Sequence, residues 1–166
     1  MKLNIRKAKI EDIKDIVNIK INGWKVAYKD ILKSDYLDSM DYDKNFERFK
    51  LEIENKSLKE NIVIEDNNTI VGYAKISILK KEEYDSQIYA IYIRPDVKNM
   101  GYGTLLMNYI KEYFKSKGCK NMILWCIDKN EQAKIFYRKQ GGIEKNKIMS
   151  KIGEEEVCEV SFLFEL

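Results

Sequence analysis

The sequence predicts one α/β domain of the mixed α+β type: a mixed, mostly antiparallel sheet of about six or seven strands flanked by about four helices. The chain has 166 residues, 45% of them hydrophobic, which fits a single domain over residues 1–166. Two strand-like segments meet at Asn67-Asn68, a pair typical of tight hairpin turns between antiparallel strands. Residues 87–127 read strand, loop, helix and strand, an order that places two strands in parallel.

The first half of the chain predicts an edge strand, two helices and a hairpin. Leu3, Ile5 and Lys7 alternate with other residues as an edge strand would. Glu11 and Asp12 then open a helix with hydrophobic residues at helical spacing. Further along we expect an aspartate-rich connection over residues 34–43, a helix over residues 42–53, strands over residues 61–65 and 69–79, and a charged turn over residues 79–86.

The second half predicts two more strands, two helices and a final hairpin. A strand over residues 87–93 ends at Arg94-Pro95, because proline has no N–H for the strand ladder. A helix then runs to Lys117, and the hydrophobic segment 122–127 is typical of a buried parallel strand. The remaining elements are a helix over residues 130–140 and a hairpin of residues 144–152 and 156–164 around Gly153-Glu154.

The residue types exclude several kinds of chemistry. The sequence has no histidine, which removes imidazole bases, Ser-His and Cys-His nucleophile pairs and histidine-ligated zinc. Cys119, Cys126 and Cys158 are an odd number of cysteines without a C-x-x-C spacing, so we interpret them as reduced structural thiols. We therefore expect no metal site.

The sequence also predicts where the protein works. No hydrophobic run approaches the roughly 20 residues of a membrane helix. The N-terminal segment MKLNIRKAKI lacks the apolar block of a signal peptide. We expect a cytoplasmic protein without membrane contact, and we leave open whether it forms a homodimer.

Positive charge is concentrated in one stretch. Residues 94–151 hold 13 Lys or Arg against five Asp or Glu, within a chain whose net charge is only +3. This pattern favours a small polyanionic ligand, although lysines that merely solvate helix faces would give the same count. Only four of the 30 basic residues are arginine, which argues against a nucleic-acid partner.

A glycine-containing loop lies between the strand over residues 87–93 and the next helix. Its sequence, KNMGYGT, places Gly101 and Gly103 where backbone N–H groups at a helix start can bind an anion. The dinucleotide fingerprint needs a third glycine at position 106, which is leucine, and a Walker loop needs Gly-Lys-Ser/Thr. The loop therefore suits a phosphate group of another type of ligand.

Together with a second motif, this loop resembles the GNAT superfamily of N-acetyltransferases. The family's phosphate loop reads Arg/Gln-x-x-Gly-x-Gly/Ala, and its next motif reads Asn-x-x-Ala-x-x-Phe-Tyr-x-x-x-Gly. Both motifs occur here in the right order, and the order of elements agrees over nearly the whole chain. The matching residues are Lys98, Gly101 and Gly103 in the first motif, and Asn130, Ala133, Phe136, Tyr137 and Gly141 in the second.

The resemblance implies acetyl-coenzyme A as the cofactor and a central parallel pair of strands that splays apart. It implies that Tyr137 donates a hydrogen bond or proton to the departing thiolate, and that a backbone N–H of residues 91–93 stabilises the negative charge on the carbonyl oxygen. The expected cofactor-binding residues are Ile91, Tyr92, Ile93, Lys98, Asn99, Met100, Gly101, Tyr102, Gly103, Thr104, Asn130, Ala133 and Phe136.

The acceptor and the general base are less well defined by the sequence. Many family members carry a glutamate where this chain has Gln87 and Tyr89, which leaves Glu83, Asp85, Glu159, a water relay or no base at all. Candidate acceptor-binding residues are Trp24, Tyr28, Gln87 and Tyr89, although Trp24 and Tyr28 would equally suit the core.

The predicted function is direct transfer of an acetyl group from acetyl-CoA to a primary amine of a small molecule or peptide. The aspartates near residues 30–43 favour a cationic amine or polyamine. Two alternatives remain: a non-catalytic acyl-CoA sensor of the same fold, which the missing glutamate favours, and a small nucleic-acid-binding protein.

Overall fold

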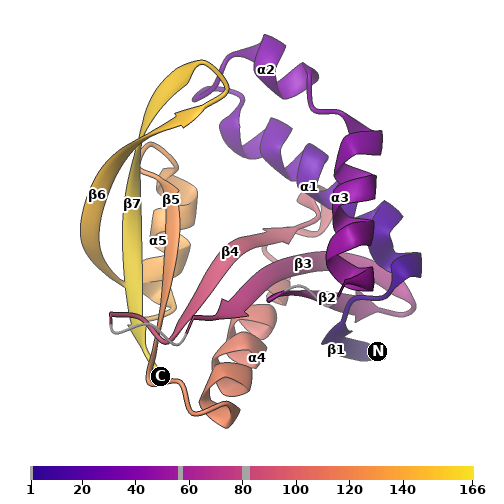
Figure 1. Ribbon diagram of the computed structural model, residues 1–166, viewed down its shortest axis with the longest axis vertical. Helices are drawn as coiled ribbons and strands as arrows, with labels where there is room; N and C mark the ends of the chain where they lie inside the picture. The colour runs from indigo at the N-terminus through magenta and orange to yellow at the C-terminus, as the bar shows by residue number, and fades with distance from the viewer. Residues whose placement is uncertain (1, 56–57, 80–82) are drawn as a thin grey trace.

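A seven-stranded sheet runs through the computed structural model, which describes residues 2–55, 58–79 and 83–166 (Figure 1). The strand order is β1-β2-β3-β4-β5-β7-β6, and neighbours are antiparallel except for the parallel pair β4 and β5. This arrangement confirms the predicted mixed sheet. The strands are β1 (Leu3–Lys7), β2 (Lys59–Asp66), β3 (Thr69–Ile78), β4 (Ser86–Ile93), β5 (Asn121–Ile127), β6 (Ile143–Ile152) and β7 (Glu155–Glu165).

The helices lie on both faces of this sheet. They are α1 (Ile13–Tyr28), α2 (Ser34–Asp38), α3 (Tyr42–Glu54), α4 (Tyr102–Ser116) and α5 (Glu131–Lys139), with 3-10 turns at Ile10–Asp12 and Pro95–Val97. Helix α2 lies in the predicted aspartate-rich connection. It has five residues and one buried hydrophobic side chain, Leu37, so it is too short to show a helical period. None of the described helices is long and apolar enough to cross a membrane.

Three buried clusters hold the helices to the sheet. Helices α1 and α3 pack on one face through Ile16, Phe49 and Tyr73, whereas α4 covers the opposite face through Leu106 and Phe114. The third cluster joins the end of α1 and helix α2 to strands β5 and β7, and it contains Tyr28, Leu32, Leu37, Ile127 and Val157.

The turns follow the sequence signals. Asn67 and Asn68 both have positive φ, 47° and 65°, which confirms the tight turn between β2 and β3. Gly153 has a φ of 61° at the predicted β6–β7 turn. The charged turn expected over residues 79–86 includes residues 80–82, which lie outside the described residues.

Strands β4 and β5 pair only at their beginnings. Their parallel register covers Ser86 with Met122, Gln87 with Ile123 and Ile88 with Leu124. Beyond that point the two strands diverge, as Figure 1 shows at the centre of the sheet. On its other side, β4 stays paired with β3 as far as Ile93. The divergence opens the middle of the sheet, as the resemblance implied.

Candidate active site

A cavity of about 460 Å³ lies where β4 and β5 diverge. Its walls come from α1, the second half of β4, the loop before α4, the end of β5 and one side of α5. Elements that are far apart in the sequence therefore meet at one opening through the sheet.

The loop before α4 has the geometry of an anion cradle. Asn99 and Gly101 have left-handed φ values of 65° and 87°, and Gly101 is the N-cap of α4. The first N–H groups of a helix have no partners within the helix, so those of Tyr102, Gly103 and Thr104 can bind a ligand. All three residues line the cavity. The helix dipole adds partial positive charge at the same place.

Two further contacts shape this cradle. The hydroxyl of Tyr102 donates a hydrogen bond to Oδ2 of Asp66 at 2.6 Å, which anchors the start of α4 to the end of β2. A Cβ added to Gly103 would lie 3.4 Å from Cζ of Phe136, so a larger residue would crowd the space between α4 and α5. These contacts hold the start of α4 beside the end of β2 and beside α5.

Lys98 is the basic residue among those that line the cavity. Several other basic residues of the 94–151 stretch pair with acids instead. Lys134 and Lys147 both contact Asp128, while Arg94 pairs with Asp96 and Arg138 with Glu144. These acids are already counted in the 94–151 stretch, so its positive surplus remains. At the cradle itself, an anion can meet Lys98 and the backbone N–H groups of Tyr102, Gly103 and Thr104.

Helix α5 brings Tyr137 to the cavity. Oδ1 of Asn130 accepts a hydrogen bond from the N–H of Ala133 at 3.2 Å and so caps the helix. Tyr137 is only 8% exposed, and its ring centroid lies 5.4 Å from that of Phe162. Burial raises the pKa of Tyr137 above its ordinary value, and Cys126 and Tyr28 raise it further. Its hydroxyl therefore remains a donor throughout the physiological pH range.

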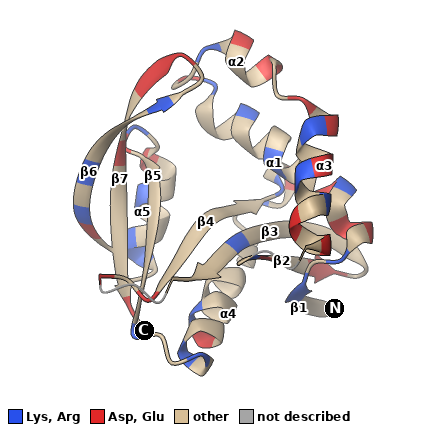
Figure 2. Ribbon diagram, viewed as in Figure 1, with Lys and Arg blue, Asp and Glu red and all other residues tan. Residues whose placement is uncertain are grey.

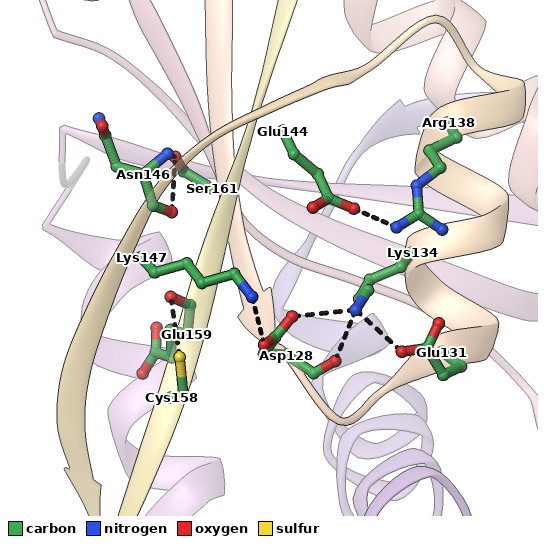
Figure 3. A network of polar contacts seen from close by, with 10 residues as sticks. All are labelled: Asp128, Glu131, Lys134, Arg138, Glu144, Asn146, Lys147, Cys158, Glu159 and Ser161. Atoms are coloured by element: carbon green, nitrogen blue, oxygen red, sulfur yellow. Dashed lines mark hydrogen bonds and ion pairs between the residues drawn. The ribbon is translucent and has the colours of Figure 1, made fainter.

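An ion-pair network holds α5 in place (Figure 3). Nζ of Lys134 donates at 2.9 Å to Oδ1 and the carbonyl oxygen of Asp128 and to Oε1 of Glu131. Lys147 on β6 reaches Oδ2 of the same Asp128 at 2.7 Å. These bonds with Lys147 and Lys134 lower the pKa of Asp128, so the network is charged at neutral pH. It ties α5 to the end of β5 and to β6.

Helix α1 forms the opposite wall. A Cβ on Gly23 would lie 3.0 Å from Cδ1 of Tyr92, so a glycine allows the helix to lie close to β4. The Tyr28 side chain lies close enough to those of Tyr92 and Asn130 for both to affect its pKa, which burial raises above the ordinary value. Tyr28 therefore lies close to both β4 and the N-cap of α5, across the divergence of the two strands.

A second cavity of about 260 Å³ adjoins the first. Both cavities are lined by Tyr89 and Trp125, so these two side chains lie where the cavities meet. Glu159 is the acidic residue of the second cavity, and Oε1 of this carboxylate accepts a hydrogen bond from the Ser150 hydroxyl. The lining residues of this cavity are Gln87, Ile88, Tyr89, Trp125, Ile148 and Glu159.

Sequence comparison identifies the family. The profile described as "Acetyltransferase (GNAT) family" matches residues 24–142, which include the anion cradle and α5. The uncharacterized N-acetyltransferase YuaI of Bacillus subtilis (strain 168) is 32% identical over 139 residues, which cover 82% of this chain and 78% of that protein. The chain belongs to the GNAT acetyltransferase family.

Two further comparisons agree with this GNAT assignment. Spermidine N(1)-acetyltransferase of Thermoplasma acidophilum is 24% identical over 146 residues, which cover 85% of this chain and 88% of that enzyme. The crystal structure of the PaiA N-acetyltransferase from Thermoplasma acidophilum in complex with coenzyme A superposes with a TM-score of 0.76 at 20% identity. It covers 96% of this chain and 98% of that chain, which confirms the predicted fold.

Most of the predicted site residues meet at the larger cavity of this GNAT domain. Met100 is the exception in the loop, because it is 59% exposed and lies outside the lining. Trp24 also lies outside the lining; it is half-buried and packs against the third cluster, with its ring centroid 4.9 Å from that of Tyr28. The residues that line the cavity are Tyr28, Tyr89, Ile91, Tyr92, Ile93, Lys98, Asn99, Gly101, Tyr102, Gly103, Thr104, Asn130, Ala133, Phe136 and Tyr137.

The other candidate bases lie outside both cavities. Glu83 accepts a hydrogen bond from the Tyr84 hydroxyl, and Asp85 accepts one from the backbone N–H of Lys120. Among the three carboxylates considered, the structure brings only Glu159 to a cavity.

The GNAT cavity also contains residues that the sequence did not single out. A glycine in the interior of α1 was one available signal, because such a glycine usually has a packing reason. The sequence analysis interpreted Cys126 only as a structural thiol. No pattern in the sequence indicated a role in the cavity for the remaining residues. These additional lining residues are Gly23, Ala27, Ala90, Val97, Trp125, Cys126 and Gln132.

Proposed function

We propose that this GNAT protein is an acetyl-CoA-dependent N-acetyltransferase that transfers the acetyl group directly to a primary amine of a small molecule or peptide. One observation carries the proposal: the anion cradle at Gly101, the part of β4 that is not paired with β5, and Tyr137 all line one cavity. Acetyl-CoA when bound supplies an activated acetyl thioester, and relatives with this fold include a protein crystallised with coenzyme A.

Each wall of the cavity has a role in this proposal. The N–H groups of Tyr102, Gly103 and Thr104 hold the pyrophosphate. The edge of β4 over residues 91–93 binds the pantetheine arm as an added strand and directs a backbone N–H at the carbonyl oxygen. Tyr137 donates its proton to the sulfur as the carbon–sulfur bond breaks.

The state of Cys126 favours direct transfer over an acetyl-enzyme. This thiol lines the cavity, but burial raises its pKa to about 12. Because the nucleophilic form of cysteine is the thiolate, a thiol with this pKa is almost wholly unreactive at neutral pH. The amine itself is then the nucleophile that attacks the acetyl group.

The second cavity is the proposed acceptor site. An ammonium group can be held there by Glu159, with Tyr89 and Trp125 as aromatic walls. Acidic residues also cluster at the tip of the β6–β7 hairpin and on α2 (Figure 2), and Lys33 donates its backbone N–H to Glu155 at 2.9 Å between them. These features favour a cationic amine, as does the relative named for spermidine.

An amine panel scored by release of coenzyme A tests the proposal. The purified protein should bind acetyl-CoA and release CoA with at least one primary amine, with one acetylamide formed for each CoA. Tight CoA binding without transfer to any alkylamine, arylamine, polyamine or peptide amine would contradict it and favour an acyl-CoA sensor. Salt-sensitive binding of RNA or duplex DNA without CoA binding would favour the nucleic-acid alternative.

A further inference from the structure

Two hydrogen bonds between a tyrosine and a carboxylate tie helix α4 to strand β2. The hydroxyl of Tyr102, the first residue of the helix, donates to Oδ2 of Asp66 at 2.6 Å. Near the other end of the helix, the hydroxyl of Tyr113 donates to Oε1 of Glu60 at 2.7 Å. Tyr113 follows Tyr102 by 11 residues, which is about 16 Å along a helix axis. The two bonds are alike in chemistry, but only the first lies at the anion cradle.

Asp66 is a fixed point on the sheet. It is the last residue of β2, and it is paired with Leu3 of β1 on one side and with Thr69 of β3 on the other. The tight turn at Asn67-Asn68 follows it directly. A hydrogen bond to the Asp66 carboxylate therefore attaches Tyr102 to the sheet itself.

The Asp66 carboxylate is poorly suited to a role in stability alone. Its Oδ1 is buried and makes no hydrogen bond within the described part of the chain. A buried carboxylate oxygen without a partner costs free energy on folding. Residues that break such a rule are concentrated at functional sites, so the bond between Asp66 and Tyr102 calls for a functional reason.

The anion cradle depends on a part of α4 that the helix does not hold by itself. The N–H groups of its first turn have no partners within the helix, and helix ends fray. On one side, Nε2 of Gln140 donates to Oγ1 of Thr104 at 3.2 Å, and Gly103 lies against Phe136 of α5. The bond from Tyr102 to Asp66 holds the same turn against β2. The first turn is thus held from two directions.

We propose that Asp66 is a positioning residue for the cofactor, whose hydrogen bond with Tyr102 holds the first turn of α4 so that its N–H groups are arranged for a pyrophosphate. The inference rests on the proposed function, because it needs coenzyme A in the cavity. Tyr102 lines this cavity and Asp66 does not, so Asp66 acts through Tyr102. A site that is already arranged for its ligand loses less conformational freedom on binding, which raises the affinity.

The charge of Asp66 opposes this role, and this allows the hydrogen bond to be tested apart from the charge. A carboxylate near the start of α4 repels a bound pyrophosphate, because both are negative. Asp66→Asn keeps an acceptor oxygen for the Tyr102 hydroxyl and removes the charge, whereas Asp66→Ala removes both. Asp66→Asn should therefore bind CoA at least as tightly as wild type, and Asp66→Ala should bind it more weakly.

Calorimetric titration with CoA and with pantetheine tests the proposal without turnover. Pantetheine has the thiol arm of CoA but no pyrophosphate, and competition with CoA gives its affinity. Tyr102→Phe keeps the buried ring and removes only the hydroxyl. Its affinity for CoA should fall by about threefold to tenfold, the effect of one hydrogen bond, while its affinity for pantetheine should not change.

Tyr113→Phe is the matched control, because it removes the same kind of hydrogen bond between α4 and β2 away from the cradle. Tyr113 lies outside the lining of both cavities. The variant should lower the melting temperature about as much as Tyr102→Phe does and keep the CoA affinity of wild type. Circular dichroism establishes that both variants are folded, which their retained rings favour.

The outcomes separate this inference from the proposed function. Wild-type protein that binds neither CoA nor pantetheine would overturn both. Where wild type binds CoA, the positioning role alone is overturned by unchanged CoA affinity in Tyr102→Phe, by equal losses for CoA and pantetheine, or by an equal loss of CoA affinity in Tyr113→Phe. A loss in Asp66→Asn as large as that in Asp66→Ala would also overturn it.

Discussion

Ser150 on β6 donates a hydrogen bond from its hydroxyl to Oε1 of Glu159 on β7, at the edge of the smaller cavity. Glu159 lines this cavity together with Tyr89 and Trp125. The Glu159 carboxylate therefore provides a negative charge at the proposed acceptor site.

Glu159→Gln should raise KM for cationic alkylamines by about fivefold or more, because it removes a charge-assisted hydrogen bond at a half-exposed site. An arylamine that is neutral at the assay pH should show no such change. Glu156→Gln is the matched control, since Glu156 lies exposed on the same strand outside both cavities. Equal KM changes for both kinds of amine would exclude recognition by charge.

Gly101→Val should abolish CoA binding, because a valine at a φ of 87° is strained and the cradle must change shape to relieve it. No described atom lies within 4 Å of a Cβ at this position, so strain rather than a clash is the cause. Lys98→Ala should only weaken binding. The measurement is calorimetry with CoA.

Gly118→Val is the matched control for this strain. Gly118 has a φ of 81°, also with no described atom within 4 Å of an added Cβ, and it lies after the other end of α4. This variant should lose a similar amount of unfolding free energy and keep its CoA affinity. Wild-type affinity in a folded Gly101→Val protein would contradict the assignment of the loop.

The sequence predicted this loop correctly because its signals are local. A proline ends β4, and the glycine at the start of α4 has the positive φ that only glycine adopts readily. The same holds for the turn at Asn67-Asn68 and for the cap at Asn130. In each case a few neighbouring residues determine the backbone geometry.

Other features depend on contacts between distant segments and could not be predicted. The spacing of Trp24 and Tyr28 shows that they share a face of α1, but not that only Tyr28 reaches the cavity. That outcome depends on how closely α1 approaches Tyr92 at Gly23. Likewise, Glu159 and Gln87 line the same cavity because β7 pairs with β5, and β5 pairs with the start of β4.

Cys126→Ala should retain acetyl transfer within about threefold of wild type, because a thiol with a pKa of about 12 supplies no nucleophile. Mass spectrometry of the protein incubated with acetyl-CoA alone should detect no acetyl group on Cys126. Cys119→Ala is the comparison, as it removes a buried thiol outside the cavities. A stable acetyl-Cys126 that disappears when amine is added would contradict direct transfer.

The protein should lose stability above about pH 10, the ordinary pKa of tyrosine. Burial raises the pKa of Tyr28, Tyr73, Tyr92 and Tyr137, so above that pH the unfolded chain releases protons that the folded chain retains. Stability from these groups is complete below pH 10 and falls as pH rises. Urea unfolding from pH 8 to 11 measures the effect.

Burial of a lysine has the opposite effect on the pH dependence of the unfolding free energy. Burial lowers the pKa of Lys20 to about 8, so this residue adds stability as pH rises from there toward the ordinary lysine value. The difference between wild type and Tyr73→Phe removes this contribution. Above pH 10 the wild type should lose unfolding free energy that Tyr73→Phe does not lose, so the stability gap between the two proteins should narrow. A gap that stays constant with pH would contradict the raised pKa of Tyr73.

Single-turnover acetyl transfer by wild type and Tyr137→Phe tests the central claim most directly, because it reports the chemical step even if product release limits steady-state turnover. The variant keeps the ring that packs against Phe162 and should bind CoA like wild type. Its transfer rate should fall by roughly 10² to 10⁴, and by less with a thioester whose thiol is a better leaving group. An unchanged single-turnover rate would contradict the role of Tyr137 as the proton donor.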